Sequence, residues 1–327
     1  MRAVFLDFGS LGPDDIDATP LTKLLPDLAL YPATSADNVQ TRIRDAEIVL
    51  VNKVRLDGSL IADCPKLKLI CLAATGTDNV DLAAAREHGI AVCNIRNYCT
   101  PSVVQHVFGV LLELTLSLAA MRDLIASGAW SRHEHFCLLD LPSRELAGKT
   151  MGIVGLGELG SAVARVASAF GMQVLAARRP YDPGDDAAGT PKADGIERVG
   201  LGKLLERSHV ISLHCPLNED TQHLVNAETL HAMRNDAVLI NTARGGLVDA
   251  DALLEALGNG VIAAAGIDVL ETEPPPADHP LLTTRLPNLL VTPHIAWAAR
   301  ESRQRAVEEL AANVEAFMQG EGRNRVA

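Results

Sequence analysis

Three side chains in the second half of this chain have the types needed for acid–base chemistry on a small carboxylic acid. Arg244 lies within NTARGGLVD, Glu273 within GIDVLETEPP and His294 within TPHIAW. Arginine binds a carboxylate through two parallel hydrogen bonds, and histidine exchanges a proton near neutral pH. A carboxylate beside the histidine stabilises the protonated ring. Together these residue types suit the addition of a hydride and a proton to a 2-keto acid, or the reverse.

Each of these residues also has an ordinary structural interpretation. Arg244 could cap the end of a helix, Glu273 before prolines could be solvated, and His294 after a proline could be structural. However, each segment directly follows an apolar stretch with the pattern of a buried strand. In a doubly wound sheet, ligands bind beyond the carboxyl ends of the strands. We therefore expect the three residues to be catalytic and to meet in one crevice together with Asp268.

A glycine-rich segment, TMGIVGLGELG, occupies Thr150–Gly160 and precedes an alanine-rich helical pattern. A strand, a G-x-G-x-x-G turn and a helix in this order are typical of a dinucleotide site, with a tight turn that binds no ligand as the alternative. The first glycine permits the turn, the second lets pyrophosphate approach, and the third lets helix and strand pack closely. The helix N-terminus then faces the phosphates. The expected dinucleotide contacts in this turn are Gly155, Gly157, Glu158, Leu159 and Gly160.

The next expected strand, QVLAA, should end near the adenosine ribose of the dinucleotide. NAD sites usually have Asp or Glu at this position, whereas this chain has Arg178 followed by Arg179. An arginine pair suits a 2′-phosphate, so we expect NADP or NAD as the cofactor, with NADPH favoured. Two ordinary surface arginines are the alternative.

Short apolar stretches alternate with helical patterns along the chain, which predicts an α/β protein with parallel sheets. The strands of the first series are expected at Ala3–Asp7, Ile48–Asn52, Leu67–Ala73 and Ile90–Asn94. The strands of the second series are expected at Thr150–Val154, Gln173–Ala176, Val210–His214, Ala237–Asn241, Ala264–Asp268 and Leu289–Thr292. Six strands with intervening helices fit a doubly wound nucleotide-binding sheet, and 327 residues are enough for two domains. Arg300–Met318 is expected to form one amphipathic helix.

Charge and composition favour some partners over others. The net charge of −12 argues against nucleic acid or an anionic membrane as a partner. The longest apolar run, Val103–Met121, is broken by Gln105, His106 and Glu113, which favours a buried helix and candidate dimer element over a membrane span. Six cysteines form no C-x-x-C pair, and the N-terminal segment lacks a signal-peptide pattern. We therefore expect a reduced, cytoplasmic compartment and no metal site.

The loop LAATGTDNVD follows the third strand of the first series. Its residues Ala74, Thr75 and Gly76 could present backbone N–H groups to the carboxylate of a substrate. The alternative is a turn between a strand and a helix that begins with an Asp cap, and both interpretations are compatible with the pattern.

At these motifs the chain resembles the family of D-isomer-specific 2-hydroxyacid dehydrogenases, and the resemblance covers nearly the whole sequence. It includes ATGTDNVD, GLGELG, HCPLNEDT, NTARGGLVD, DVLETEPP and TPHIAW. The resemblance implies that Arg244, Glu273 and His294 are the catalytic arginine, glutamate and histidine. It also implies two Rossmann-like, doubly wound domains with the active-site cleft between them. Cofactor contacts implied in this way are Thr75, Cys215, Thr242, Ala243, Arg244, Asp268 and His294.

The same resemblance implies a discontinuous substrate-binding domain at residues 1–99 and 294–327, a dinucleotide-binding domain at 100–293, and a homodimer formed through the latter. The segments HIAWAA and FCLLD are most similar to the glycerate dehydrogenase or hydroxypyruvate reductase branch. Trp297 stands where many relatives have a small residue, which favours a small substrate such as hydroxypyruvate or glyoxylate. The alternatives are a phosphoglycerate-, formate- or phosphonate-type dehydrogenase, or a nucleotide-sensing binding protein of the same fold.

Overall fold

The computed structural model describes residues 1–179, 181 and 194–327, which divide into two compact units. The terminal unit comprises Met1–Thr100 and Trp297–Ala327, and the central unit comprises Pro101–Ala296. The chain thus passes between the units at Thr100/Pro101 and at Ala296/Trp297, close to the expected boundaries at 99/100 and 293/294.

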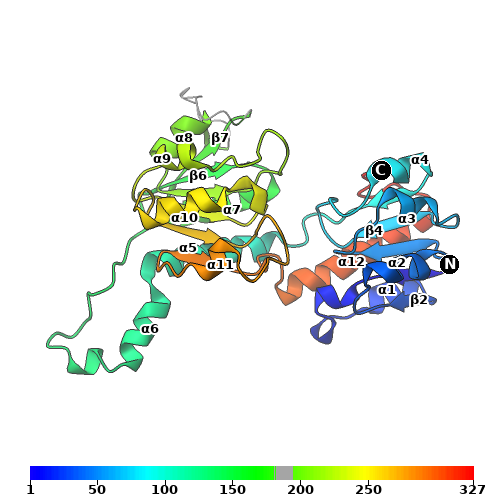
Figure 1. Ribbon diagram of the computed structural model, residues 1–327, viewed down its shortest axis with the longest axis horizontal. Coiled ribbons are helices and arrows are strands. Elements are labelled where there is room, and N and C mark those ends of the chain that lie inside the picture. Colours follow the sequence, from blue (N-terminus) through cyan, green and yellow to red (C-terminus); the bar gives the residue numbers. More distant parts are fainter. Residues whose placement is uncertain (180, 182–193) are drawn as a thin grey trace. The chain divides into compact units, whose positions relative to one another are not determined.

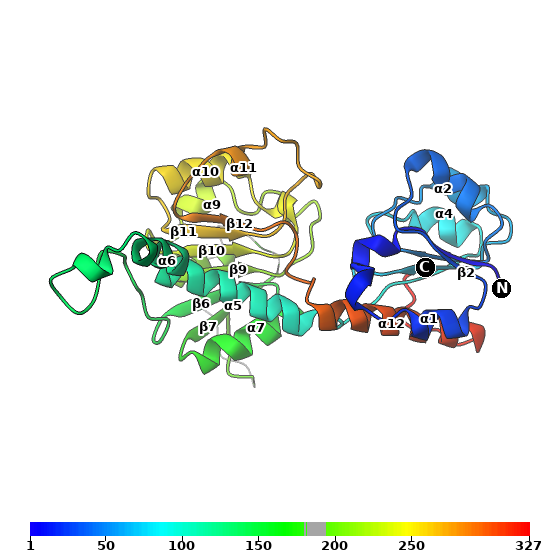
Figure 2. The same ribbon diagram turned by 90° about the horizontal axis from the view of Figure 1, so that it is seen from below.

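The terminal unit is built on a parallel sheet, which has five strands among the described residues, in the order β2-β1-β3-β4-β5. The strands are β1 (Ala3–Phe5), β2 (Leu28–Leu30), β3 (Ile48–Val51), β4 (Leu69–Leu72) and β5 (Ala91–Cys93). One face packs on α1 (Thr19–Leu24) and α12 (Arg300–Met318). The other face packs on α2 (Ala36–Ile43), α3 (Gly58–Ala62) and α4 (Leu82–Glu87). Figure 2 shows these two helical layers on opposite sides of the sheet.

The central unit contains a parallel sheet that, among the described residues, has seven strands in the order β12-β11-β10-β9-β6-β7-β8. The strands are β6 (Thr150–Val154), β7 (Gln173–Ala177), β8 (Glu197–Val199), β9 (Val210–Leu213), β10 (Val238–Asn241), β11 (Ala264–Ile267) and β12 (Leu289–Val291). The order reverses between β6 and β9, which is the point where doubly wound sheets bind their ligands.

Helices cover both faces of this sheet. One apolar core joins the strands to α8 (Leu201–Arg207), α9 (Ala227–His231), α10 (Ala250–Gly258) and α11 (Pro280–Thr283). The opposite face carries α5 (Thr100–Leu116) and α7 (Glu158–Ala169) (Figure 2). The close approach of α5 requires a glycine on β11, since a Cβ on Gly266 would lie 2.2 Å from Val110 of α5.

The strands and helices confirm the expected α/β fold with two parallel sheets. Every strand expected from the sequence is present, and α12 has the expected bounds. The expectation of six strands in the second series was wrong, because β8 adds an edge strand, and β2 likewise adds one to the terminal unit. Both extra strands are only three residues long, too short to show a period of two.

The expected helix over Val103–Met121 is also not continuous. It ends at Leu116, Ser117 has a left-handed backbone (φ 53°), and α6 (Leu118–Ala126) follows with none of its residues buried. Figure 1 shows α6 and the residues after it extending away from the sheet of their own unit. Among the described residues, no single helix is long and apolar enough to cross a membrane, and the α5–α6 pair that reaches that length together is bent by 52°.

Candidate active site

The candidate residues of the central unit follow strands whose last residues pair in register. Val154, Leu213, Asn241, Ile267 and Val291 form a continuous row of neighbours across β6, β9, β10, β11 and β12. The residues that follow these strands therefore share one edge of the sheet, since parallel strands have their carboxyl ends on the same side. They are Gly155, His214, Thr242, Asp268 and Thr292.

The glycine-rich turn lies at the point where the strand order reverses. Gly155 has φ 100°, and a Cβ there would lie 2.5 Å from the amide nitrogen of Cys215. A Cβ on Gly160 would lie 2.2 Å from the carbonyl oxygen of Gly155, so helix and turn touch directly. A Cβ on Gly157, by contrast, would have no described heavy atom within 4 Å.

Gly157 is also the N-cap of α7, which starts with Glu158 and Leu159 and has no side-chain cap. The first N–H groups of a helix without such a cap attract an anion, because they carry partial positive charge and lack intrahelical partners. Open space over Gly157 beside these N–H groups fits the pyrophosphate of a dinucleotide.

Arg178 and Arg179 directly follow β7 along the chain, and β7 lies next to β6 in the sheet. The amide of Arg178 donates to Val199 of β8 at 2.8 Å, and its side chain is half-buried. Arg179 is exposed, and its Nε donates to the hydroxyl of Tyr181 at 3.3 Å, a bond that raises the pKa of the guanidinium. Both residues thus stand at the strand end where a 2′-phosphate would be read.

Two further candidates have side chains that suit contact with a bound ligand rather than chemistry. Burial raises the pKa of the Cys215 thiol to about 11, so the thiol stays protonated and is a poor nucleophile at neutral pH. The Thr242 hydroxyl is one of two buried side-chain groups, among the described residues, that find no hydrogen-bond partner. An unmatched buried hydroxyl is costly unless a ligand completes it.

Arg244 is held by the loop that follows β10. The buried side chain of Asn241 accepts from the amide of Ala243 at 3.0 Å and donates to the carbonyl of Arg244 at 2.9 Å. Gly245 fits this loop against the next one, since a Cβ there would lie 1.9 Å from the carbonyl carbon of Leu270. The Arg244 loop and the Glu273 loop therefore touch through their backbones.

Glu273 and His294 form a direct pair. The distance between His294 Nδ1 and Glu273 Oε2 is 2.5 Å, and both side chains are half-buried. The other carboxylate oxygen of Glu273 accepts from the amide of Leu270 at 2.9 Å, which fixes the direction of the carboxylate. His294 has φ 53°, a strained value for a residue other than glycine, and its amide donates to the carbonyl of Asp268 at 2.7 Å.

Asp268 is only 2% exposed, and its carboxylate is bonded to the segment that carries His294. Its two oxygens accept from the amides of Ile295 and Ala296 at 3.0 and 2.9 Å, and from the Thr292 hydroxyl at 2.5 Å. Sequence reasoning placed Asp268 at the cofactor and did not identify Thr292, or Ser102 and His106 of α5, which contact the same segment. The spacing of Ser102 and His106, one helical turn apart, was the available signal.

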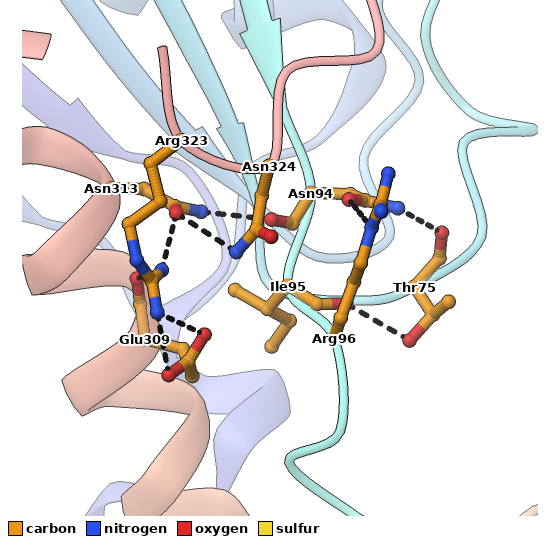
Figure 3. A network of polar contacts seen from close by, with 8 residues as sticks. All are labelled: Thr75, Asn94, Ile95, Arg96, Glu309, Asn313, Arg323 and Asn324. Carbon is orange, nitrogen blue, oxygen red and sulfur yellow. Dashed lines mark hydrogen bonds and ion pairs between the residues drawn. The ribbon is translucent and has the colours of Figure 1, made fainter. Parts of the chain in front are cut away.

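The candidate residues of the terminal unit form a loop after β4. The carbonyl of Ala74 accepts from the amide of Ile95 at 3.2 Å, and the Thr75 hydroxyl donates to the carbonyl of Ile95 at 2.9 Å. The carbonyl of Thr75 accepts from Asn94 Nδ2 at 2.7 Å (Figure 3), and Gly76 is half-buried. The loop is therefore fastened to the segment that follows β5.

That segment is in turn fastened to α12 and the C-terminal residues, as Figure 3 shows. Asn313, 1% exposed, donates to the carbonyl of Asn94 at 2.8 Å. Its oxygen accepts from Arg323 at 2.6 Å and from Asn324 at 3.1 Å, and Arg323 pairs with Glu309 through two bonds of 2.8 and 2.9 Å.

Trp297, the first residue of the terminal unit after the chain leaves the central unit, packs on the core of that unit. Its ring lies 6.4 Å from that of Tyr98, with the planes inclined by 59°.

Comparisons with known proteins agree with this geometry. Residues 108–296 match the NAD-binding domain of D-isomer-specific 2-hydroxyacid dehydrogenases. The chain is 42% identical to a glycerate dehydrogenase of Methylorubrum extorquens over 99% of its length and 98% of the relative's. It is 38% identical to a hydroxypyruvate reductase of Blautia hydrogenotrophica, covering 98% of each chain. The structure of a D-lactate dehydrogenase from Aquifex aeolicus, complexed with NAD and lactic acid, has a TM-score of 0.80 and 32% identity, covering 98% of this chain and 96% of that one.

The matched residues lie within the central unit and cover nearly all of it, and they include the glycine-rich turn and the edge of the sheet described above. The cofactor is therefore a nicotinamide dinucleotide, and the enzyme is an oxidoreductase that acts on CH–OH groups. By the match of its central unit and its similarity to relatives over nearly its full length, this chain belongs to the family of D-isomer-specific 2-hydroxyacid dehydrogenases.

Proposed function

We propose that the protein reduces a small 2-keto acid, hydroxypyruvate or glyoxylate, to the 2-hydroxy acid of D configuration, and that it catalyses the reverse oxidation. The observation that carries the proposal is the 2.5 Å contact between His294 Nδ1 and Glu273 Oε2 beside the dinucleotide-binding edge of the sheet. The relatives named glycerate dehydrogenase and hydroxypyruvate reductase support this substrate class.

The three catalytic candidates divide the reaction between them. Arg244 binds the carboxylate of the substrate with its planar guanidinium and thereby orients C2. His294, paired with Glu273 through Nδ1, donates a proton from Nε2 to the carbonyl oxygen while C2 gains a hydride. Glu273 stabilises the protonated imidazole before the transfer. The nicotinamide, when bound, supplies the hydride in reduction and accepts it in oxidation.

For the cofactor, the residues of the glycine-rich turn would hold the pyrophosphate at the N-terminus of α7. The unmatched Thr242 hydroxyl, Ala243 and Cys215 would line the nicotinamide side, with Thr75, Asp268 and the catalytic residues as further contacts. Arg178 and Arg179 favour NADPH over NADH, because two cations at the ribose position match a 2′-phosphate and no acidic side chain directly follows β7.

For the substrate, we assign a binding role to the terminal unit. Its Ala74, Thr75 and Gly76 loop would bind the substrate carboxylate through backbone N–H groups. Trp297 would limit the size of the group attached to C2, since its bulky ring is fixed against the core of the unit.

The test of this function is the rate at which the enzyme oxidises NADPH and NADH with each of four keto acids. They are hydroxypyruvate, glyoxylate, pyruvate and 3-phosphohydroxypyruvate, the keto acid that corresponds to 3-phosphoglycerate. We expect turnover with hydroxypyruvate or glyoxylate. The variants His294→Asn and Glu273→Gln should lower kcat by roughly 10²- to 10⁴-fold, because a positioned general acid contributes about that factor. Arg244→Ala should both raise KM and lower kcat.

The matched control is His88→Asn, which alters an exposed histidine of the terminal unit and should leave kcat within twofold of the unaltered enzyme. Cofactor binding, followed by nicotinamide fluorescence, should persist in the His294 and Glu273 variants. The proposal would be refuted by an enzyme that binds the cofactor but turns over none of these acids. Full activity of the His294→Asn variant would refute it as well.

We also propose a homodimer in the cytoplasm. The segment 117–142, which we call the arm, exposes large apolar side chains, among them Phe136 (89% exposed) and Leu139 (85% exposed). Exposed apolar groups gathered on a projecting segment are typical of a protein interface, and a second copy of this chain is the partner that the family resemblance implies. The cytoplasmic location is supported by the six cysteines, all of which are free thiols.

A further inference from the structure

Two polar side chains of α5 contact the short segment that carries His294. Ser102 and His106 are four residues apart, so they lie on the same face of the helix. The Ser102 hydroxyl donates to the carbonyl of Ala296 at 2.6 Å, and His106 Nε2 lies 3.0 Å from the Thr292 hydroxyl oxygen. The helix therefore contacts the segment at both ends, two residues before and two residues after His294.

The hydrogen bonds at the Thr292 end have a definite direction. The Thr292 hydroxyl has a single proton, and it donates that proton to Asp268 at 2.5 Å. At 3.0 Å from His106 Nε2, the hydroxyl oxygen must then accept, so His106 carries its proton on Nε2. His106 Nε2 also lies 3.4 Å from the carboxylate of Asp268.

Asp268 continues this chain of bonds to the backbone beside the catalytic residue. Its carboxylate accepts from the amides of Ile295 and Ala296, and its carbonyl accepts from the amide of His294. A carboxylate that is almost fully buried is costly unless donors surround it, and here the donors are the Thr292 hydroxyl and the two amides after His294. The position of each donor is thereby tied to the others.

The bond from Ser102 to Ala296 also lies where the chain passes between the two units. The chain passes between the two units at Thr100/Pro101 and at Ala296/Trp297, and the bond from Ser102 to Ala296 joins these two passages. His294 itself has a left-handed backbone, a conformation that persists only where the surroundings impose it.

We propose that Ser102, His106, Asp268 and Thr292 form a clasp that positions the His294 imidazole for proton transfer. His106 is a positioning residue that acts through Thr292 and Asp268, and it does not touch the substrate. The proposal rests on the proposed function of His294 as the proton donor. It adds two residues of α5, a helix outside the catalytic motifs, to the determinants of turnover.

The test compares His106→Leu, which removes the donor, with His106→Gln, whose amide can still donate to Thr292. Thr292→Val serves as a second probe, because it removes the central hydroxyl while keeping the shape of the side chain. Gln105→Ala, an exposed neighbour on the same helix, is the matched control. Steady-state kinetics with hydroxypyruvate, cofactor affinity, and hydrogen exchange of the backbone amides of residues 292–297 are measured for each variant.

We expect His106→Leu and Thr292→Val to lower kcat by roughly 10- to 100-fold, since a displacement of about 1 Å at a reacting group has that effect. Cofactor affinity should stay within twofold, and His106→Gln should recover most of the lost kcat. The amides of Ile295 and Ala296 should exchange faster in the two damaging variants, and Gln105→Ala should match the unaltered enzyme. A folded His106→Leu or Thr292→Val enzyme with kcat within twofold of normal overturns the clasp.

The exchange measurement separates this proposal from the proposed function, because it needs no substrate. Faster exchange at Ile295 and Ala296 in an enzyme that reduces no keto acid would support the clasp as a structural device and refute the catalytic assignment. Unchanged exchange in every variant of an active enzyme would refute the clasp alone.

Discussion

Arg178 is the residue that we propose to decide the choice between the two nicotinamide cofactors. It follows β7 directly, and its amide is fixed to β8, so its side chain starts from a defined position. Replacing it with glutamate should turn a preference for NADPH into one for NADH. The expected change in the ratio of kcat/KM values is about 10- to 100-fold, because a hydrogen bond to a charged group contributes about 1.5–3 kcal/mol.

The measurement is kcat/KM for NADPH and NADH in the unaltered enzyme and in Arg178→Glu. Arg165→Glu, at an exposed position of α7, introduces the same change of charge away from the strand end and should leave the ratio unchanged. A ratio that Arg178→Glu fails to move would remove Arg178 from the cofactor site.

We expect His214 to make the stability of the protein depend on pH. It follows β9, its Nε2 lies 2.9 Å from the Ser212 hydroxyl oxygen, and burial lowers its pKa from 6.5 to about 4. Between these values the unfolded chain binds a proton and the folded chain does not, so stability falls as the pH falls from about 6.5 to about 4. The full shift in pKa would correspond to a loss of about 3 kcal/mol in the free energy of unfolding. Because His214 is partly exposed to solvent, this value is an upper limit.

Urea unfolding at pH 7.5 and pH 4.5 tests this expectation by comparing the unaltered protein with His214→Gln. Glutamine preserves the ability to bond Ser212 but takes up no proton. The unaltered protein should therefore lose more free energy of unfolding between the two pH values than the variant loses. Equal losses in both proteins would show that His214 does not contribute to the acid sensitivity.

At the scale of the elements, the C-terminal helix and the residues after it hold the loop after β4, to which we assign a role in substrate binding. Asn313 of α12 bonds the Asn94 carbonyl, and the Asn94 side chain bonds Thr75 (Figure 3). Asn313→Ala leaves a buried carbonyl without its donor, which costs about 1–3 kcal/mol. We expect that loss in the free energy of unfolding, together with a higher KM for the keto acid, because the Thr75 loop is released.

The control is Lys66→Ala, which breaks an exposed ion pair with Asp45 in the same unit. Such pairs contribute about 0–1 kcal/mol, so this variant should be almost unchanged in stability and in KM. An Asn313→Ala protein with a normal KM would show that the network supports the unit without affecting the loop.

The break between α5 and α6 shows how an element can depart from its sequence pattern. Neither glycine nor proline stands at residue 117, so the apolar run predicts one helix. In the structure, the Glu113 carboxylate reaches forward along the chain and accepts from the amide of Ala119 at 3.1 Å, while Ser117 takes up the left-handed conformation. A cap supplied by a side chain six residues earlier is a contact that hydropathy patterns do not contain.

At the scale of the whole molecule, the arm is the feature that a single copy of the chain does not explain. If the arm forms the interface of a homodimer, the double variant Phe136→Glu and Leu139→Glu should dissociate it into monomers of 34.8 kDa. Charged side chains cannot be buried there without a partner of opposite charge, which is why the effect should be large.

Light scattering coupled to size-exclusion chromatography gives the mass directly. Met318→Glu, which charges an exposed apolar residue of α12, is the control and should leave a dimer intact. An unaltered protein that elutes as a monomer at micromolar concentration would refute the dimer, and a double variant that stays dimeric would place the interface elsewhere.

The sequence by itself determined the class of fold, the two series of strands and the dinucleotide turn. These follow from local patterns: apolar runs of four or five residues, glycines at fixed spacing and an alanine-rich helix. It also identified Arg244, Glu273 and His294 as candidates, because each follows a strand pattern. The structure places Glu273 and His294 2.5 Å apart although 21 positions separate them along the chain.

Only the tertiary structure decided which residues support these candidates. The bonds of Ser102 to Ala296 and of Asn313 to Asn94 join residues 194 and 219 positions apart, and no local period records such pairs. The short edge strands β2 and β8 likewise depend on a neighbouring strand rather than on their own three residues. Local sequence sets the conformations that a segment favours, whereas a polar residue acquires its partner only when folding closes the loop between them.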